Sequence, residues 1–142
     1  MVEEPDVVVV PAGDVLLGDP PRTEHVNVFA IARRPVTRSE LARFREDAGG
    51  AEPATGLTWA DAVAYCRSLT TSTGRIYRLP DEREWEKAAR AGLLQDVLAL
   101  EWTNTWAGGR VLRGRDDVAK RLRAGDDLSA VGFRVVRGMT GR

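Results

Sequence analysis

The alternation of hydrophobic and polar residues predicts three helices, of which the clearest covers residues 82–92. Pro80 prevents that helix from beginning earlier. Asp81 and Glu84 have the spacing of a capping box, in which each side chain accepts a hydrogen bond from the other residue's backbone N–H. Trp85 and two alanines follow at intervals of three and four residues, so they share one face. We expect that face to be buried against a neighbouring element.

Two more capping boxes predict helices earlier in the chain. The first helix begins after Thr37 and ends at the Gly49-Gly50 pair, and the second begins after Thr58. Helical spacing assigns their core-facing side chains, which are Leu41, Phe44 and Ala48 in the first helix and Trp59, Val63, Cys66 and Leu69 in the second. A buried thiol has a raised pKa, so we interpret Cys66 as a packing residue rather than as a nucleophile.

The predicted strands are short runs of β-branched or alternating residues. Residues 7–10 and 15–17 flank a Gly13-Asp14 turn signal and predict a hairpin. Residues 25–31 suit a strand that is buried on parts of both faces. The remaining predicted strands are residues 100–103, 110–113 and 131–137. Helices interleaved with short strands in this way predict an α+β fold.

Length and composition are typical of one globular domain covering residues 1–142, with 43% hydrophobic and 30% charged residues. The formal net charge is +0, so no overall field draws the protein to nucleic acid or to an anionic membrane surface. No apolar stretch approaches the roughly 20 residues that span a bilayer, and the acidic N-terminal residues do not resemble a signal peptide. We therefore expect a cytoplasmic protein with no nucleic-acid or membrane partner.

A single cysteine and a single histidine, Cys66 and His25, limit the available chemistry. They allow neither an internal disulfide nor a zinc site made of the usual ligands, and a non-haem iron triad needs a second histidine. No phosphate-binding loop, dinucleotide fingerprint or Gly-x-Ser-x-Gly motif occurs. The acidic pairs at 116–117 and 126–127 are typical of solvent-exposed loops. The sequence therefore predicts no catalytic residue, no metal site and no cofactor.

Several motifs follow one another along almost the whole chain. They are Pro35-Val36-Thr37, Leu57-Thr58-Trp59, Tyr65-Cys66, Arg78-Leu79-Pro80, Glu84-Trp85-Glu86, Glu101-Trp102-Thr103, Leu112-Arg113-Gly114 and Gly132-Phe133-Arg134. In this order they resemble the landmarks of the formylglycine-generating enzyme (sulfatase-modifying factor) family. The resemblance implies the C-type-lectin-like variant of an α+β fold, with little regular secondary structure and long surface loops.

The enzyme of that family uses copper, bound by two C-terminal cysteines, to convert a substrate cysteine into formylglycine. Residues 119–132 occupy the corresponding place and contain no cysteine. Cys66 matches a different, helical cysteine of the family. The resemblance therefore implies a shortened member without the copper chemistry, and we do not expect an enzyme. The long insertion that carries calcium-binding loops in the family is reduced here to residues 93–100.

The variable proteins of diversity-generating retroelements are similar in the same landmarks. That resemblance implies a rigid scaffold displaying a mutable ligand-binding surface near the C-terminus. The corresponding surface here would consist of Asn104, Trp106, Arg110, Arg115, Asp116, Asp117, Lys120, Arg121 and Arg123. Aromatic and arginine side chains suit binding hot spots, so we expect a protein or a small ligand to bind this loop face.

Two alternatives stay open from the sequence alone. The chain could be an accessory or regulatory domain for a fixed protein partner. It could also be an enzyme of unknown oxidative chemistry, related to formylglycine-generating enzyme.

Overall fold

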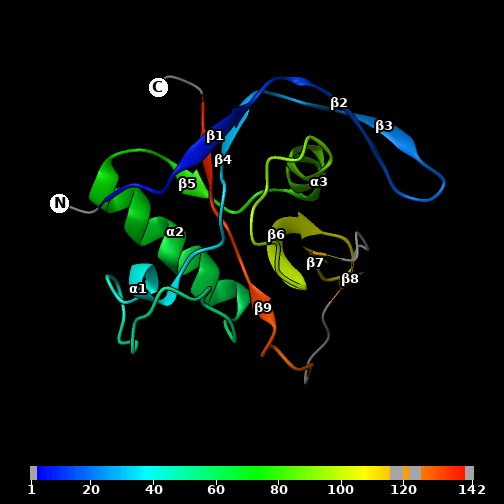
Figure 1. Ribbon diagram of the computed structural model, residues 1–142. Helices are drawn as coiled ribbons and strands as arrows, with labels where there is room; N and C mark the ends of the chain where they lie inside the picture. The colour runs from blue at the N-terminus through cyan, green and yellow to red at the C-terminus, as the bar shows by residue number, and fades with distance from the viewer. Residues whose placement is uncertain (1–2, 116–119, 122–125, 140–142) are drawn as a thin grey trace.

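Three small β-sheets and three helices make up the part of the chain that the computed structural model describes, which is residues 3–115, 120–121 and 126–139 (Figure 1). The first sheet has the strand order β1-β4-β10-β5 with every neighbouring pair antiparallel. Its strands are β1 (Val7–Val10), β4 (Phe29–Ala32), β10 (Val136–Gly138) and β5 (Tyr77–Arg78). Segments from the beginning, middle and end of the chain thus form one sheet, which agrees with the predicted α+β class.

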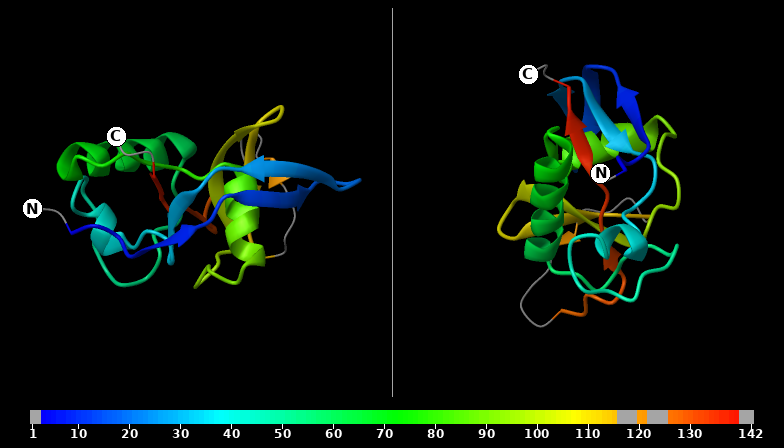
Figure 2. Two further views of the ribbon diagram at one scale, coloured as in Figure 1. Left: turned by 90° about the horizontal axis from the view of Figure 1, so that it is seen from above. Right: turned by 90° about the vertical axis from the view of Figure 1, so that its left-hand side faces the viewer.

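A second pair of strands, β2 (Gly13–Leu17) and β3 (Arg22–Val26), extends the ribbon formed by β1 and β4 into an arm (Figures 1 and 2). Val10 lies opposite Phe29, and Gly13 lies opposite Val26. β1 therefore continues into β2, and β3 continues into β4. The four strands form one two-stranded ribbon, which bends at residues 11–12 and 27–28.

The predicted hairpin between residues 7–10 and 15–17 is wrong, because β1 pairs with β4 and β2 pairs with β3. Pro11 has no backbone N–H to donate to a neighbouring strand. It bends the chain between β1 and β2 but does not reverse its direction. The reversal occurs instead after Gly18, whose φ of 91° suits a turn. The strand predicted at residues 25–31 is likewise divided into β3 and β4 at the bend.

All three predicted capping boxes are present, at the N-termini of α1 (Arg38–Leu41), α2 (Trp59–Thr73) and α3 (Glu82–Arg90). α2 ends at Gly74, which is in the left-handed conformation that a helix C-terminus favours. α3 ends at Ala91, beside the predicted Gly92. No helix in the described ranges is both long and apolar enough to cross a bilayer.

α1 is much shorter than its pattern predicted. It ends at Leu41 rather than at Gly49, and Ala48 is exposed. The backbone N–H of Gly50 bonds the Ser39 side chain while the Gly50 carbonyl accepts from the Ser39 backbone, so residues 42–50 fold back across the helix start. One buried leucine with a half-buried Phe44 gives this segment too little apolar surface to extend a helix.

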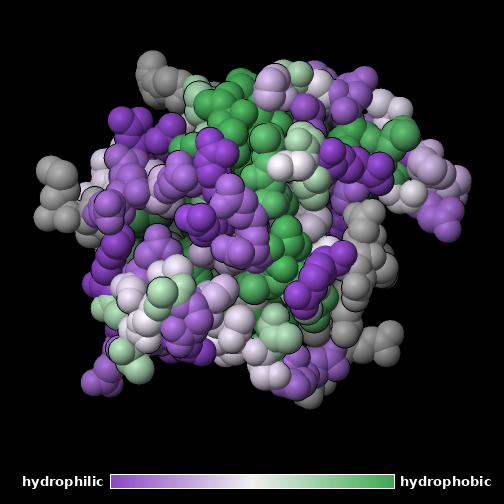
Figure 3. Space-filling model, viewed as in Figure 1, coloured by the Kyte–Doolittle hydropathy of each residue, from purple (hydrophilic) through white to green (hydrophobic). Residues whose placement is uncertain are grey.

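The main core lies between α2 and the sheets. Tyr65, Cys66 and Leu69 of α2 are buried there together with Trp102 and Phe133. The predicted burial of Trp85 and Ala88 on α3 is confirmed, with exposed fractions of 2% and 0%. In Figure 3, hydrophilic residues cover most of the visible face and hydrophobic residues form a band down its middle.

The third sheet has the order β8-β7-β6-β9 and contains the three strands predicted last. These are β6 (Leu100–Trp106), β7 (Arg110–Arg113) and β9 (Val131–Gly132), which runs parallel to β6, while β8 (Lys120–Arg121) pairs with β7. The single strand predicted for residues 131–137 is divided into β9 and β10. The division occurs around Arg134, whose side chain is drawn into the core.

Arg134 forms a fully buried ion pair with Glu101 of β6, and both side chains are 0% exposed. The Nε and one terminal nitrogen of the guanidinium donate to the two carboxylate oxygens at 2.7 and 2.9 Å. The terminal nitrogens also donate to the carbonyl oxygens of Arg33, at 2.7 Å, and Gln95, at 3.1 Å. Each end of the guanidinium therefore has partners.

The carboxylate of Glu101 is equally saturated. It accepts hydrogen bonds from the Trp85 indole N–H at 2.9 Å and from the Leu98 backbone N–H at 3.0 Å. A buried ion pair is tolerated only when such additional hydrogen bonds offset its desolvation. Here the hydrogen bonds come from the segment after β4, from α3, from the 95–98 loop and from β6, so the pair joins separate parts of the chain.

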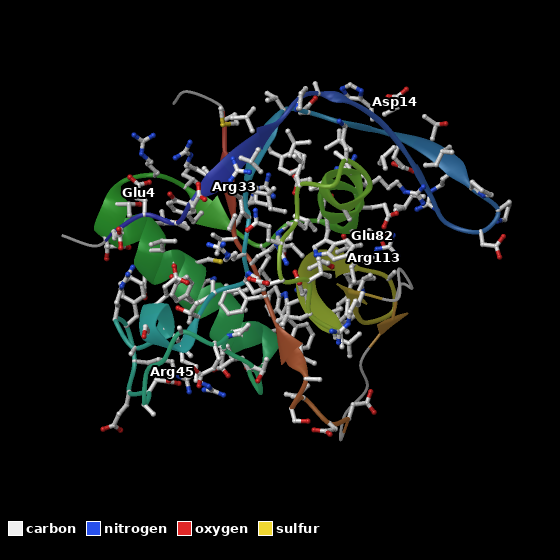
Figure 4. All side chains as sticks on the ribbon, in the orientation of Figure 1. Glu4, Asp14, Arg33, Arg45, Glu82 and Arg113 are labelled. Carbon is white, nitrogen blue, oxygen red and sulfur yellow. The ribbon has the colours of Figure 1, made fainter. Side chains whose placement is uncertain are left out.

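A second buried carboxylate, Glu86, connects α3 to β7. One of its oxygens accepts from Arg113 at 2.7 Å and the other accepts from Arg90 at the end of the same helix. Figure 4 places Arg113 beside α3 and the β6–β7 strands. α3 is therefore held in place by the ion pair between Glu86 and Arg113 of β7 as well as by the packing of Trp85.

We expect Arg134→Met to lower the free energy of unfolding by about 3–5 kcal/mol, because it leaves the Glu101 carboxylate buried without its cation. Chemical denaturation measures this loss. Arg34→Met is the control, since Arg34 is 65% exposed and pairs with a similarly exposed Asp96, and should cost less than about 1 kcal/mol. Equal losses in the two variants would show that the buried pair does not hold the fold.

Burial raises the pKa of the Cys66 thiol from its ordinary 9.0 to about 12, and the nearby Arg78 opposes this only in part. The folded state therefore disfavours the thiolate. Its contribution to stability is complete below pH 9 and is lost as the pH rises toward 12. At pH 10 we expect the wild type to have lost roughly 1 kcal/mol more of unfolding free energy than Cys66→Ala, relative to pH 7. Parallel pH profiles for the two proteins would contradict this expectation.

Candidate functional site

The β6–β7 hairpin presents three of the predicted site residues on one surface. Asn104 and Trp106 lie on β6 with one residue between them, so both side chains leave the same face of the strand. Both residues are exposed, Trp106 to 67%. Trp106 lies directly opposite Arg110 of β7, and the connecting turn contains Gly108 in the left-handed conformation. A tight turn therefore holds the tryptophan and the arginine side by side.

The Arg110 guanidinium lies between two indole rings. It is 3.7 Å from the ring centroid of Trp59 and 5.4 Å from that of Trp106. Both distances are within the range of cation–π attraction. One terminal nitrogen also donates weakly to the Asn104 carbonyl at 3.4 Å. The stacking restricts a side chain that would otherwise sample many rotamers.

Trp59, at the first position of α2, is the site residue that sequence reasoning missed. Its helical spacing assigned it to the core, yet its ring is only half-buried and its other face meets Arg110. The indole N–H donates to the Thr103 carbonyl at 3.2 Å, which orients the ring. No local pattern distinguishes this tryptophan from a core residue, because its exposed side depends on where β6 and β7 pack.

A cavity of about 300 Å³ lies next to Trp59, between α2 and the strands. Its lining combines apolar side chains with a few polar ones: Trp59, Val63, Cys66, Arg67, Tyr77, Arg78, Leu79 and Asn104. Cys66 is 3% exposed, and its raised pKa keeps it a neutral thiol, as the sequence predicted. Asn104 belongs both to the cavity lining and to the hairpin surface, so the two features are continuous.

Of the remaining predicted site residues, only Arg115 has a described side chain, and it does not join this surface. Arg115 follows the far end of β7, where it lines a separate cavity of about 280 Å³ beside Trp85 and Glu86. Lys120 and Arg121 form β8, which pairs with β7, but the structure does not describe their side chains. Asp116, Asp117 and Arg123 are outside the described residues altogether. Asn104, Trp106 and Arg110 are therefore the part of the predicted set that the structure brings together.

The copper-binding cysteine pair of the resembled enzyme has no counterpart in this sequence. The chain has one cysteine, and its thiol points into the α2 core. Within the described ranges, no three histidine, cysteine, aspartate or glutamate side chains come close enough to hold a metal ion. The surface instead offers stacked rings, a guanidinium, an amide and an apolar cavity.

Three solved structures share this architecture. Superposition on PvdO from Pseudomonas aeruginosa gives a TM-score of 0.79 with 18% identity, covering 95% of each chain. CarF gives 0.72 with 17% identity over 96% of this chain and 99% of its own. Treponema denticola variable protein 1 gives 0.74 with 16% identity over 93% and 94%. At these identities the likeness is one of fold, and it confirms the C-type-lectin-like prediction.

Comparison with the sequences of curated proteins finds no match. The sequence profile of the sulfatase-modifying factor enzyme 1-like domain, in contrast, matches residues 1–123, which is most of the chain. The motif order, the fold and this match agree with one another. The chain belongs to the sulfatase-modifying factor enzyme 1-like domain family.

Proposed function

We propose that this domain is a non-catalytic binding module, and that Asn104, Trp106 and Arg110, together with Trp59, form its binding surface. The observation that carries the proposal is the exposure of Trp106. Trp85 and Trp102 are 2% and 5% exposed, whereas Trp106 is 67% exposed and contacts a guanidinium instead of the core. Tryptophan and arginine are among the residue types enriched at the energetic centres of protein interfaces.

The residues beneath this surface support the view that binding and stability depend on different side chains of β6. Trp102 donates its indole N–H to the Leu57 carbonyl at 2.9 Å, and the Thr103 hydroxyl bonds the Val111 carbonyl. Both side chains are buried, while Asn104 and Trp106 on the same strand are exposed. Surface residues on such a strand can change without disturbing the core that holds it.

The specific form of this proposal is a variable protein diversified by a retroelement. Such a protein needs a stable framework and a set of replaceable side chains, and β6 and β7 offer both. The fold shared with Treponema denticola variable protein 1 supports this form, because it shows that the chain adopts an architecture found in a protein named as variable. The protein partner or small ligand would then be set by the residues present at the hairpin surface.

Selection from a phage-displayed library of random peptides tests the binding function. Wild-type protein should enrich peptides, and these should bind a Trp106→Ala/Arg110→Ala double variant at least ten-fold more weakly, because the stacked anchor has been removed. Fluorescence polarisation of the enriched peptides measures both affinities. Peptides that bind the two proteins equally, or a library that yields no binders, would refute the assignment of this surface.

The stability of two single variants is the control for that selection. Trp106→Ala should change the unfolding free energy by less than about 0.5 kcal/mol, because the ring is outside the core. Trp102→Ala, four residues earlier on β6, should cost about 3–5 kcal/mol because that ring is buried. A large loss of unfolding free energy in Trp106→Ala would mean that the weaker peptide binding of the double variant comes from unfolding.

The diversified form makes a separate prediction about the gene. DNA near it should contain a near-copy of the codons for Trp102 to Arg134, mismatched at adenines and close to a reverse transcriptase gene. Sequencing the flanking DNA checks this. A flanking region without such a copy would exclude retroelement diversification and leave a binding module with an unchanging partner.

A further inference from the structure

We propose that the cavity between α2 and β6 accepts an acidic peptide segment in extended conformation, with an apolar side chain inside the cavity and a carboxylate at each of Arg67 and Arg110. This inference rests on the proposed binding function, because Arg110 and Asn104 belong to both. It adds the chemical class of the partner and a new recognition residue, Arg67.

Charge pairing across the molecule singles out these two arginines. Among the arginines whose side chains the structure describes, thirteen have a carboxylate within ion-pair distance. Arg67, Arg110 and Arg115 have none among the described residues. Arg67 lines the cavity and Arg110 stacks on Trp59 at its edge, so two of the three adjoin one cavity. Cations left without partners beside a cavity favour an anionic ligand.

The spacing along α2 suggests the form of that ligand. Trp59, Val63 and Arg67 are four residues apart and share one face of the helix. The helical rise places Trp59, with Arg110 above it, about 12 Å from Arg67 along the axis. An extended peptide advances about 3.3 Å per residue, so two side chains four residues apart span about 13 Å. Those two side chains and the one midway between them also point to the same side of the peptide.

The cavity wall suits an uncharged apolar side chain at the middle position. Val63, Leu79 and the neutral thiol of Cys66 contribute to it, and no acidic residue lines it. Arg78 also lines it, but its two terminal nitrogens bond the two carboxylate oxygens of Glu84 at 2.7 and 2.8 Å. Its charge is therefore neutralised within the protein. The pattern that fits is acidic, any, apolar, any, acidic.

The exposed amide of Asn104 provides the remaining contact. It lies at the cavity between Trp59 and the hairpin, and the structure shows no side-chain hydrogen bond for it among the described residues. An asparagine amide can donate to and accept from a peptide backbone at the same time. Asn104 thus offers the polar contacts that the apolar wall lacks.

The test uses the whole 142-residue chain and three probes. These are the peptide acetyl-Gly-Glu-Gly-Leu-Gly-Glu-Gly-amide, the same peptide with glutamine in place of both glutamates, and free glutarate. Titrations followed by ¹H–¹⁵N NMR, including the indole N–H signals of Trp59 and Trp106, measure the affinities. We expect the glutamate peptide to bind at least ten-fold more tightly than either of the other two probes.

Matched variants test the two arginines. Arg67→Gln and Arg110→Gln should each weaken binding of the glutamate peptide at least five-fold. Arg22→Gln removes the same charge from the β2–β3 arm, where Arg22 pairs with Glu24, and should leave the affinity unchanged. If Arg67→Gln binds like the wild type, or if the glutamine peptide binds equally well, the proposal is overturned.

Two further outcomes separate this proposal from the function on which it rests. Glutarate binding as tightly as the glutamate peptide would assign the cavity to small dicarboxylates and overturn the peptide class. Library peptides that require Trp106 but neither acidic residues nor Arg67 would leave the binding function standing and overturn the acidic class. A library without binders, combined with a glutamate peptide that does not bind, would overturn both the acidic-peptide proposal and the binding function.

Discussion

The structure depends on the buried pair of Arg134 and Glu101. A guanidinium and a carboxylate removed from water destabilise a core unless every donor and acceptor is used. Here the two side chains meet that requirement by bonding Arg33, Trp85 and the 95–98 loop. Apart from the 15-residue helix α2, the regular elements of the described chain are short. This hydrogen-bonded centre therefore supplies part of the cohesion that several long helices or a large sheet would give.

The same centre defines what the outer surface is free to do. Glu101, Trp102 and Thr103 are buried on β6, and the exposed positions begin at Asn104. The inner half of the strand is committed to the core, while Asn104 and Trp106 of the outer half are exposed and Thr105 between them accepts a hydrogen bond from the Glu82 backbone N–H of α3. Arg110 illustrates the difference from Arg134, because its guanidinium is held by two ring faces rather than by a buried acid. One of the two arginines serves the interior, and the other lies at the hairpin surface.

Sequence reasoning succeeded where the determining interactions were local. The capping boxes at Thr37, Thr58 and Asp81 involve residues three apart, and each is present in the structure. The burial of Trp85 followed from helical spacing alone. The pairing of β1 with β4 could not be derived in this way, because it depends on a reversal after Gly18 and on how Pro11 bends the ribbon.

The candidate site shows the same limit. The sequence named Trp106 and Arg110 among the candidate surface residues, but the contribution of Trp59 arises from packing between segments about 50 residues apart. The separation of Arg115 follows from its place at the opposite end of β7. Spacing along the chain predicts neighbours within an element, whereas the faces shared by different elements come from the tertiary packing.

The position of β10 has a consequence for synthesis on the ribosome. β10 lies inside the first sheet, between β4 and β5, although it comes last among the strands of the described chain. Until it emerges, β4 has an open edge and the Glu101 carboxylate has no cation. Contacts between residues about 100 positions apart must close late, which slows folding and lengthens the exposure of an unpaired strand. In a growing chain, one edge of β4 therefore stays unpaired until β10 has been synthesised.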